Sequence, residues 1–441
     1  MRAYQKKMSE FVYDTPRRMM GSETEYTTGL AGHLTTTVDP RLIAFANHED
    51  EVWLKNGARL YIDHGDLLEY ASPECMSGSQ VLLHERIGQF VVRDLGALVD
   101  DSESERRLPV YKRTGYGMAA GTRRDGATII QWPNLSAGHH ETYQTGLSSE
   151  ALAYYRPFLE AYLATRIVWT GAGMVADDGY RLSQKAEAID FRSWELTKHG
   201  KKTGLRYRGA GRVEIRTGEG NMSDWVIPRK FDMTSLVFRL MEHGQVPFNR
   251  IISEGFETDT FRNASRDPLD LILADDVRMD AIDVQARIAE YALEFATRHD
   301  VPKDEIVAAR DVLAICDDLN AYFMEYEDLS VLSDRLDWAA KLDKLRSRGI
   351  ELGKVSCANL VAVAHDLSWE DTSRGGAAER WYRTRQPATF SEADVRRNLG
   401  NPPSARAKAR IDAIREHGDS VSWVGWKELR RTGTRPVVFE P

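Results

Sequence analysis

The sequence predicts an α+β fold, and two patterns along the chain support that class. In the first half, segments such as 59–63 and 212–216 alternate between charged and aliphatic residues, which is typical of strands with one polar face. Between 232 and 348, apolar residues instead recur every three or four positions, which is typical of helices. Because strand patterns give way to helical ones, we expect an α+β core.

The chain is expected to have three parts. Residues 1–18 are polar and are predicted to form a flexible tail. Residues 19–348 would form the core, since 441 residues suffice for one large domain and a smaller one. Beyond Gly349 the pattern is mixed, and Pro402 and Pro403 interrupt the chain before a basic helix. We therefore assign 349–441 to a small C-terminal domain.

The individual elements follow from the spacing of apolar residues. A polar loop is expected over 27–56, between the first two strands, and Pro157 is expected to kink the second helix. Strands are predicted at 20–26, 56–63, 109–112, 128–132, 212–216 and 421–426, and helices at 81–99, 149–170, 284–295, 303–324, 333–348 and 405–416.

Composition excludes several classes of function. The formal net charge of −8, with charges of both signs mixed along the chain, argues against nucleic acid or an anionic membrane as the main partner. No apolar run is long enough to span a bilayer, and the N-terminus lacks the apolar centre of a signal peptide. Cys75, Cys316 and Cys357 have no CxxC spacing, so we expect reduced thiols in a cytoplasmic protein.

The strand 56–63 is the most informative segment. Arg59, Tyr61 and Asp63 alternate with aliphatic residues, so a cation, a phenol and a carboxylate share one strand face. Side chains two residues apart on a strand lie roughly 6.5 Å apart, which is close enough to share a ligand. Three more acids follow within a dozen residues: Asp66, Glu69 and Glu74. This arrangement suits a site for a metal and a phosphate.

Carboxylate oxygens are the ligands that Mg²⁺ prefers, and Mg²⁺ in turn orients ATP and neutralises charge on a transferred phosphoryl group. Any one glutamate, taken alone, is more often a solvated acid of an acidic protein. The combination of Glu23, Asp63 and Glu69 with Arg59 favours a functional site.

Other motifs in the sequence do not indicate a metal, dinucleotide or hydrolase site. His139 and His140 are adjacent, so on a strand they point to opposite faces, and no third ligand follows at a zinc spacing. The glycines at 171–173 end a predicted helix and are typical of a C-cap, not of a dinucleotide fold. The chain has neither a GxxxxGK[ST] loop nor a GxSxG elbow, so ATP would bind without a P-loop.

Several segments occur in a recognisable order and spacing: 21–26, 56–74, 136–143, 180–184, 212–223, 337–338, 402–403 and 422–424. Together they resemble the Pup ligase and depupylase family, which is related to glutamine synthetase and the γ-glutamylcysteine ligases. The resemblance implies a glutamine synthetase-like fold, in which a curved antiparallel β-sheet packed with helices cradles ATP and Mg²⁺.

The resemblance also implies roles for single residues. Glu23, Tyr61 and Glu69 match metal ligands, and Asp63 matches the catalytic aspartate. The residues implied in nucleotide binding are Arg59, Ser72, Arg212 and Trp423. The implied reaction is phosphorylation of a glutamate γ-carboxylate by ATP, followed by attack of an amine, with Asp63 as the general base.

The chain departs from the family at some positions. The family's Thr-Arg-Asp-Glu-Pro-His segment has no counterpart in 194–202. Glu214 stands where the family has a histidine, Arg216 where it has an aliphatic residue, and Asp66-Leu67-Leu68 where it has Ser-His-Pro. The depupylases carry a long insertion after the first strand, whereas here only 27–56 connects the two strands, which favours a ligase.

Four hypotheses therefore remain for the function. The first is a ligase that joins a small Pup-like protein modifier to a protein lysine. The second is a ligase of the same chemistry for small-molecule or peptide substrates, and the third is a depupylase or deamidase. The fourth, an inactive relative that only binds a partner, is disfavoured because Glu23, Arg59, Tyr61, Asp63 and Glu69 are all present. The sequence leaves the donor, the acceptor and the oligomeric state open.

Overall fold

The structure is a computed structural model. It describes residues 17–27, 34–63, 67–98, 110–114, 116–123, 126–186, 188–195, 203–209, 211–247, 260–269, 279–325, 328–351, 355–356, 358–372 and 375–439. Most of the predicted tail (1–16), residues 64–66 with the acid Asp66, and most of the segment 194–202 that departs from the family (196–202) lie outside the described residues.

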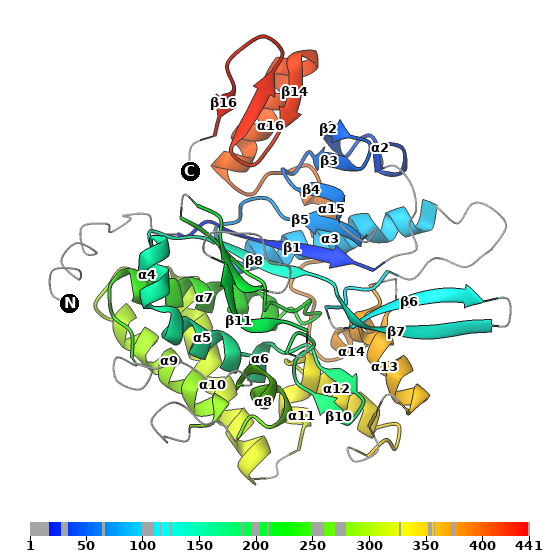
Figure 1. The fold of residues 1–441 in the computed structure, drawn as a ribbon, viewed down its shortest axis with the longest axis vertical. Coiled ribbons are helices and arrows are strands. Elements are labelled where there is room, and N and C mark those ends of the chain that lie inside the picture. The colour runs from blue at the N-terminus through cyan, green and yellow to red at the C-terminus, as the bar shows by residue number, and fades with distance from the viewer. Residues whose placement is uncertain are drawn as a thin grey trace.

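A nine-stranded sheet forms the centre of the described structure (Figure 1). Its strand order is β11-β12-β13-β8-β1-β5-β4-β3-β2, and every pairing is antiparallel except that of β11 with β12. The strands are β1 (Met20–Tyr26), β2 (Ile43–His48), β3 (Glu51–Leu54), β4 (Arg59–Asp63), β5 (Leu67–Ala71), β8 (His139–Gln144), β11 (Asp190–Glu195), β12 (Thr203–Tyr207) and β13 (Arg212–Ile215). The antiparallel sheet expected from the resemblance is confirmed.

Helices cover one face of this sheet. Helix α3 (Gly78–Leu98) places Ile87 and Val91 against Leu60 and Tyr70, the apolar sides of β4 and β5. The larger core lies around α7 (Val226–Glu242), which packs on α3 and α10. The other helices of this core are α4 (Ser149–Tyr154), α5 (Arg156–Thr165), α6 (Ile167–Thr170), α8 (Thr260–Arg266), α9 (Ala281–Ala296), α10 (Lys303–Glu325), α11 (Ser330–Ser333) and α12 (Asp337–Arg346).

Most predicted elements are present, with two corrections. The helix expected over 149–170 is broken at Tyr155 and Arg166 into α4, α5 and α6, and Pro157 lies in the first turn of α5. The polar loop expected over 27–56 is wrong, because it contains α2 (Leu34–Thr37), β2 and β3. All four residues of β3 are buried, so this strand has no alternation of buried and exposed residues.

Two smaller hairpins lie outside the main sheet. Strands β6 (Tyr116–Arg123) and β7 (Gly126–Ser136) pair with each other, and β7 contains the strand predicted at 128–132. Strands β9 (Met174–Ala176) and β10 (Gly179–Arg181) form the second. In the region predicted as a strand at 109–112, Tyr111 makes isolated bridges to Thr27 and Asp371. Among the described helices, none is long and apolar enough to cross a membrane.

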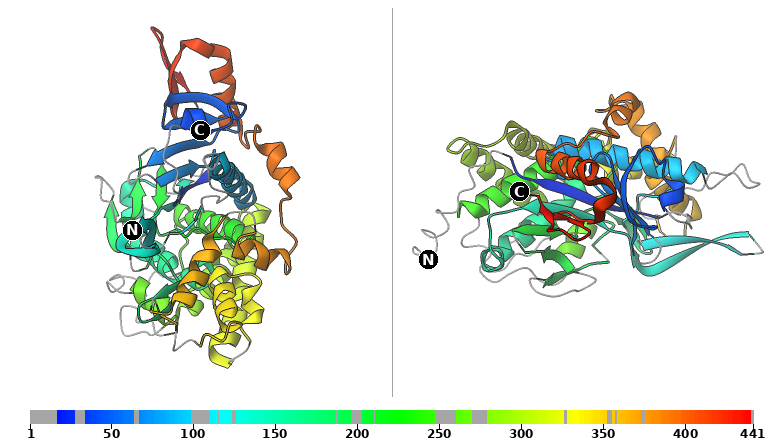
Figure 2. Two further views of the ribbon diagram at one scale, coloured as in Figure 1. Left: turned by 90° about the vertical axis from the view of Figure 1, so that its right-hand side faces the viewer. Right: turned by 90° about the horizontal axis from the view of Figure 1, so that it is seen from above.

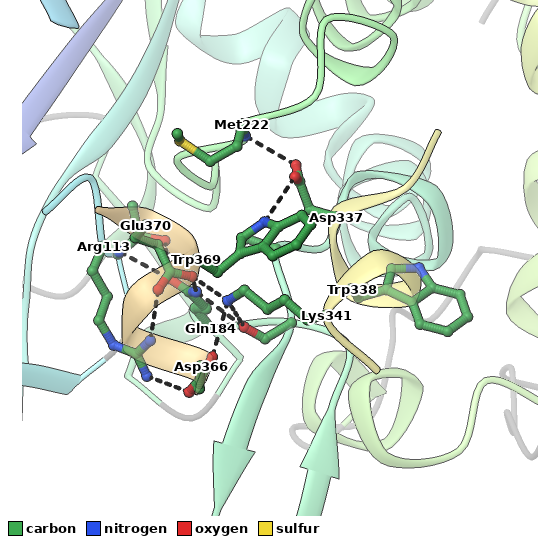
Figure 3. A network of polar contacts seen from close by, with 12 residues as sticks. Arg113, Gln184, Met222, Asp337, Trp338, Lys341, Asp366, Trp369 and Glu370 are labelled. Atoms are coloured by element: carbon green, nitrogen blue, oxygen red, sulfur yellow. Dashed lines mark hydrogen bonds and ion pairs between the residues drawn. The ribbon is translucent and has the colours of Figure 1, made fainter. Parts of the chain in front are cut away.

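A buried polar network joins helices before and after residue 349 (Figure 3). Asp366 and Glu370 of α13 (Leu360–Glu370) accept hydrogen bonds from Arg113 at 2.9 and 3.0 Å. Lys341 of α12 contacts both carboxylates from the other side. The network ties α13 to α12 and to the chain segment at Arg113. Helices α14 (Ala377–Arg383) and α15 (Glu392–Asn398) follow.

Residues 405–439, here called the C-terminal unit, form their own small cluster. The unit contains α16 (Ala405–His417), a three-residue 3₁₀ turn (Gly418–Ser420) and strands β14 (Val421–Val424), β15 (Glu428–Arg431) and β16 (Val437–Val438). Its apolar residues Ile411, Val424 and Leu429 pack with Trp53 of β3 and Phe45 of β2. Figure 2 shows the unit beside β2 and β3, at one end of the molecule. The domain boundary near residue 349 stays a prediction.

Arg410 fastens this unit to the sheet. Its side chain is fully buried, and its guanidinium lies 4.9 Å from the ring centres of both Trp53 and Trp426. The same guanidinium forms an ion pair with Glu74, which follows β5, and donates to the carbonyl oxygen of Trp426 at 3.2 Å. One cation thus joins three segments that are distant in the sequence.

Arg410→Ala is expected to destabilise the protein by about 3 kcal/mol, because it leaves the largely buried Glu74 carboxylate without its main partner. Urea unfolding of both forms measures this change. Arg415→Ala, at an exposed position of the same helix, is the matched control and should change stability by about 0.5 kcal/mol or less. Equal effects of the two substitutions would contradict the proposed anchoring.

Candidate active site

Strand register brings the predicted site residues onto one face of the sheet. In neighbouring strands Glu25 pairs with Glu69, and Glu69 pairs with Tyr61. Glu23, two residues before Glu25, lies on the same face because side chains alternate along a strand. Asp63 lies at the end of β4, opposite Leu67. The opposite face of these strands is the one covered by α3.

Four carboxylates meet there, and we call Glu23, Glu25, Asp63 and Glu69 the acidic cluster. Ligand atoms of Glu23, Glu69 and His140 lie within 4.8 Å of one another, as do those of Glu25, Asp63 and Glu69. Glu69 belongs to both groups. The arrangement fits divalent cations with oxygen ligands, such as Mg²⁺.

The electrostatics of Glu69 support a cation at this position. Burial raises the pKa of Glu69 well above its usual range, and the negative charges of Glu23 and Glu25 raise it further. Such a carboxylate is costly to ionise unless positive charge is supplied nearby. A bound divalent cation would supply that charge.

Glu23 lies at the boundary between the acidic cluster and positive groups. Burial acts to raise its pKa, but the hydrogen bond from His140 and the charge of Arg212 outweigh burial and lower the pKa to about 2. Nη2 of Arg212 donates to Oε1 of Glu23 at 3.3 Å. Glu23 is therefore ionised at neutral pH and available as a metal ligand.

Arg59 and Tyr61 form one stacked pair. The Arg59 guanidinium lies 4.0 Å from the centre of the Tyr61 ring, and its Nη2 donates to Glu51 at 2.7 Å. Nε of Arg59 is buried and has no hydrogen-bond partner among the described residues. Burial, followed by the charges of Glu23 and Glu69, raises the pKa of Tyr61, so its phenol is neutral. Arg59 therefore lies on the face of the acidic cluster with one buried N–H group unsatisfied.

A cavity opens beside the acidic cluster, between the sheet and the C-terminal unit. Glu23, Ser72 and Arg212, three of the predicted site residues, line it. The full lining is Met19, Met20, Gly21, Ser22, Glu23, Ser72, Pro73, Glu74, Thr142, Gln144, Arg212, Arg406, Trp426 and Lys427. Oγ of Ser72 accepts the backbone N–H of Ser22 at 2.9 Å and so joins β5 to β1 at this cavity.

Trp423 does not line this cavity. Its side chain is 38% exposed, and the Arg430 guanidinium lies 4.7 Å from its ring centre. Trp426, three residues later, lines the cavity and packs edge-on against Trp53 at 4.7 Å. The structure thus places a different tryptophan of the C-terminal unit at the cavity, and the nucleotide contact of Trp423 stays a prediction.

The strand β1 is supported from behind by a buried polar network. Oγ1 of Thr24, between the two glutamates of β1, donates to Glu85 at 3.2 Å and contacts His139 Nδ1 at 3.0 Å. Glu85 forms an ion pair with Lys112 at 2.5 Å, and Lys230 contacts His139 Nε2 at 3.2 Å. His139 lies behind the sheet while His140 lies on the face of the acidic cluster, so the two histidines point to opposite sides as predicted.

Sequence reasoning missed Glu25 and His140 as candidate ligands, and Trp426 as a cavity residue. The sequence placed Glu25 on the strand face of Glu23, but the pairing of Glu25 with Glu69, which brings it to the cluster, is tertiary. For His140 and Trp426 the only signal is tertiary, since each is placed by its neighbours on other strands: Glu23 beside His140 and Trp53 beside Trp426.

Comparisons with known proteins agree with this architecture. Among relatives, the Pup–protein ligase of Kocuria rhizophila is 26% identical, over 95% of this chain and 93% of its own. That of Gordonia bronchialis is 29% identical, over 93% of each. Solved structures of the Pup ligase PafA share the fold. The complex with Pup has a TM-score of 0.73 at 22% identity, covering 96% of this chain and 89% of that chain.

The PafA structure with ADP gives a TM-score of 0.71 at 21% identity and covers 89% of this chain and 87% of that chain. The family model described as Pup-ligase protein matches residues 33–430, which is most of the chain. This match spans the central sheet from β2 onward, the acid-bearing strands β4 and β5, and the C-terminal unit through most of β15. The chain therefore belongs to the Pup-ligase protein family.

Proposed function

We propose that this protein is an ATP-dependent ligase that joins the γ-carboxylate of a glutamate on a Pup-like modifier to a lysine of a target protein. The observation that carries this proposal is the acidic cluster on one sheet face, beside the cavity lined by Arg212 and Ser72. Relatives over nearly the full length are Pup–protein ligases, and one solved structure of similar fold contains ADP.

The first step would form an acyl phosphate. An oxygen of the donor γ-carboxylate bonds to the γ-phosphorus of ATP, the bond to the β–γ bridging oxygen breaks, and ADP leaves with that electron pair. Mg²⁺, when held by Glu23, Tyr61 and Glu69, would neutralise charge on the phosphates. Arg59 and Arg212 lie on the same face, and their guanidiniums would bind phosphate oxygens.

The second step would form the isopeptide bond. The lysine nitrogen bonds to the acyl carbon, the bond from carbon to the phosphate oxygen breaks, and phosphate leaves. Asp63 would take the proton that the ammonium must lose before its nitrogen can attack, and the departing phosphate would take the second proton that this nitrogen loses as the amide forms. Its place at the end of β4, partly exposed, leaves room for an incoming side chain.

Two further features belong to this proposal. A protein lysine is favoured over a small amine because the relatives reported above are named as protein ligases. Ligation is favoured over removal of the modifier for the same reason. We also propose that the C-terminal domain closes on the nucleotide, because Arg406, Trp426 and Lys427 line the cavity, and that the protein acts in the cytoplasm.

The direct test is incubation of the protein with ATP, Mg²⁺, a Pup-like donor ending in glutamate, and an acceptor protein. ADP and phosphate should form only when donor is present, and a conjugate should appear with the acceptor. Conjugation of free amino acids but not of proteins would favour the small-molecule alternative. Release of modifier from a preformed conjugate, without ADP formation, would favour a depupylase.

Asp63→Asn is expected to lower conjugate formation by roughly 10²–10⁴-fold, the usual contribution of a general base. ATP binding should remain nearly intact, since the substitution keeps the shape of the side chain. Gel assays of conjugate and calorimetric titration with ATP measure the two effects. Asp419→Asn, at an exposed position, is the control. Loss of ATP binding in Asp63→Asn would instead make Asp63 a ligand of the metal.

Glu23→Ala should abolish the Mg²⁺ dependence of nucleotide binding. Removing a group that only supports a metal ligand costs roughly 10–100-fold in metal affinity. Because Glu23 is proposed as a ligand itself, its removal should cost at least as much. Titration of ADP with and without Mg²⁺ measures it, and Glu290→Ala on the exposed side of α9 is the control. Unchanged Mg²⁺ dependence would remove Glu23 from the metal site.

Trp426→Ala and Trp423→Ala form a matched pair that locates the nucleotide base. If the base stacks on the cavity tryptophan, Trp426→Ala should weaken ADP binding by about 1–3 kcal/mol, while Trp423→Ala leaves it unchanged. Urea unfolding of both variants checks that the packing of Trp426 on Trp53 is not the cause. The opposite pattern would support the assignment of Trp423 made from the family resemblance.

A further inference from the structure

A group of arginines lies beside the acidic cluster, on the same face of the sheet. Arg206 of β12 pairs with Glu214 of β13, and Glu214 pairs with Thr142 of β8. His140, two residues before Thr142, shares its face and pairs with Glu23 of β1. The side chains of β12 and β13 at these positions therefore face the same space as the acidic cluster. We call Arg206, Arg208, Glu214 and Arg216 the arginine group.

Glu214 is the centre of the arginine group. Its side chain is fully buried, and its Oε2 accepts a hydrogen bond from Nε of Arg208 at 2.6 Å. Its Oε1 lies 3.7 Å from Nη1 of Arg206 and 3.7 Å from Nε of Arg216. A buried carboxylate is costly unless it is paired with cations. Its position among three guanidiniums therefore indicates that it holds arginines in place.

Arg208 is the member of the arginine group that lies next to Arg212 and interacts electrostatically with Glu23. Its backbone N–H donates to the carbonyl of Arg212 at 2.8 Å across the turn between β12 and β13, and Gly209 gives that turn its positive φ of 73°. Arg208 thus lies next to Arg212, whose guanidinium contacts Glu23 at 3.3 Å. Burial acts to lower the pKa of Arg208, but Glu214 and, more weakly, the charges of Glu23 and Tyr61 raise it.

Arg208 also has capacity for a ligand. Its side chain is 35% exposed, and within the described structure its one side-chain hydrogen bond is the Nε contact to Glu214. The described structure gives the Nη groups no hydrogen bond, so they remain as donors. Arg216 is used differently, because its Nε donates to Nε2 of His140 at 3.3 Å. The Nη groups of Arg208 are thus the donors best placed to serve an anion over the acidic cluster.

Phosphoryl transfer needs such a donor. Charge spreads over the non-bridging oxygens of the γ-phosphoryl group as it moves, and a positioned guanidinium stabilises that charge through two parallel N–H groups. The Thr-Arg-Asp-Glu-Pro-His segment of the family has no counterpart in this sequence, and Glu214 replaces a histidine. In this chain the buried Glu214 and its partner Arg208 occupy the region next to Arg212.

We propose that Arg208 is a further catalytic residue that binds the γ-phosphoryl group of ATP during its transfer, and that Glu214 is the positioning residue that orients it. The proposal rests on the proposed function. In the step it serves, the donor carboxylate oxygen bonds to phosphorus, the bond to the β–γ bridging oxygen breaks, and ADP takes the electron pair. Arg208 donates hydrogen bonds to the non-bridging oxygens and loses no proton.

The first experiment distinguishes binding of the γ-phosphoryl group from binding of the ADP portion of the nucleotide. Arg208→Gln should lower the rate of donor-dependent ADP formation by roughly 10²–10³-fold, as when one preorganised donor is removed. The affinity of this variant for ADP alone should match that of the unmodified protein. Aluminium fluoride takes the place of the γ-phosphoryl group and should increase the affinity of the unmodified protein for ADP. This increase in affinity should be lost in the variant. Arg208→Lys should recover little, since an ammonium cannot reproduce the planar fork. Arg298→Gln, an exposed ion-paired arginine of the same type, is the control.

The second experiment tests the positioning role. Glu214→Gln keeps the charge of Arg208 but removes its charged partner, so it should lower kcat while leaving ADP affinity and the donor KM unchanged. Glu214→Asp should restore part of kcat. If the Glu214 variants do not fold, as judged by urea unfolding, the Arg208 variants alone decide the proposal.

Three results would overturn the proposal. The first is full activity of Arg208→Gln. The second is an equal loss of ADP and ADP–aluminium fluoride affinity, which would make Arg208 a structural residue or a contact of the ADP portion. The third is a raised donor KM with aluminium fluoride binding intact, which would make the anion a donor carboxylate. The binding measurements need no donor, so absence of ligase activity in the unmodified protein would overturn the proposed function without deciding the role of Arg208.

Discussion

The convergence of carboxylates on β1, β4 and β5 is the constraint on which the rest of the structure depends. Glu23, Glu25 and Glu69 are brought together by strand register, and like charges at such distances repel strongly when partly removed from water. Protein groups offset part of this repulsion, namely Arg212 and His140 at Glu23. Burial and the remaining repulsion together raise the pKa of Glu69, and a bound cation would make this carboxylate less costly to ionise.

The strands that carry these acids are held both by the helical layer behind β1 and by the C-terminal unit. Behind β1, Thr24 and the buried pair of Glu85 with Lys112 tie the strand to the helical layer. At the other end of the sheet, Arg410 ties the C-terminal unit to Glu74, just after β5. Because Trp426 in that unit lines the cavity, a shift of the unit would change the cavity and leave the acidic cluster intact. The acidic cluster and the C-terminal side of the cavity are therefore built from separate elements, and Glu23 belongs to both the cluster and the cavity lining.

The sequence predicted which side chains share a strand face better than it predicted which strands pair with each other. Alternation in 59–63 placed Arg59, Tyr61 and Asp63 on one face, as the structure confirms. Alternation says nothing of register, so the pairing of Glu25 with Glu69 and of His140 with Glu23 could not be derived locally. Strands β2 and β3 were missed because they are short and flanked by polar residues, and Trp426 because only its packing on Trp53 distinguishes it from Trp423.

The same limit explains why departures from the family are informative only in three dimensions. In the sequence, Glu214 is one more acid on an alternating strand. In the structure it is fully buried among Arg206, Arg208 and Arg216, one strand away from His140 and the acidic cluster. A glutamate in that place would be costly without those arginines, and the arginines would repel one another without it. The acid and its arginines are therefore interdependent, and a substitution that looks unfavourable alone becomes part of a site that can bind an anion.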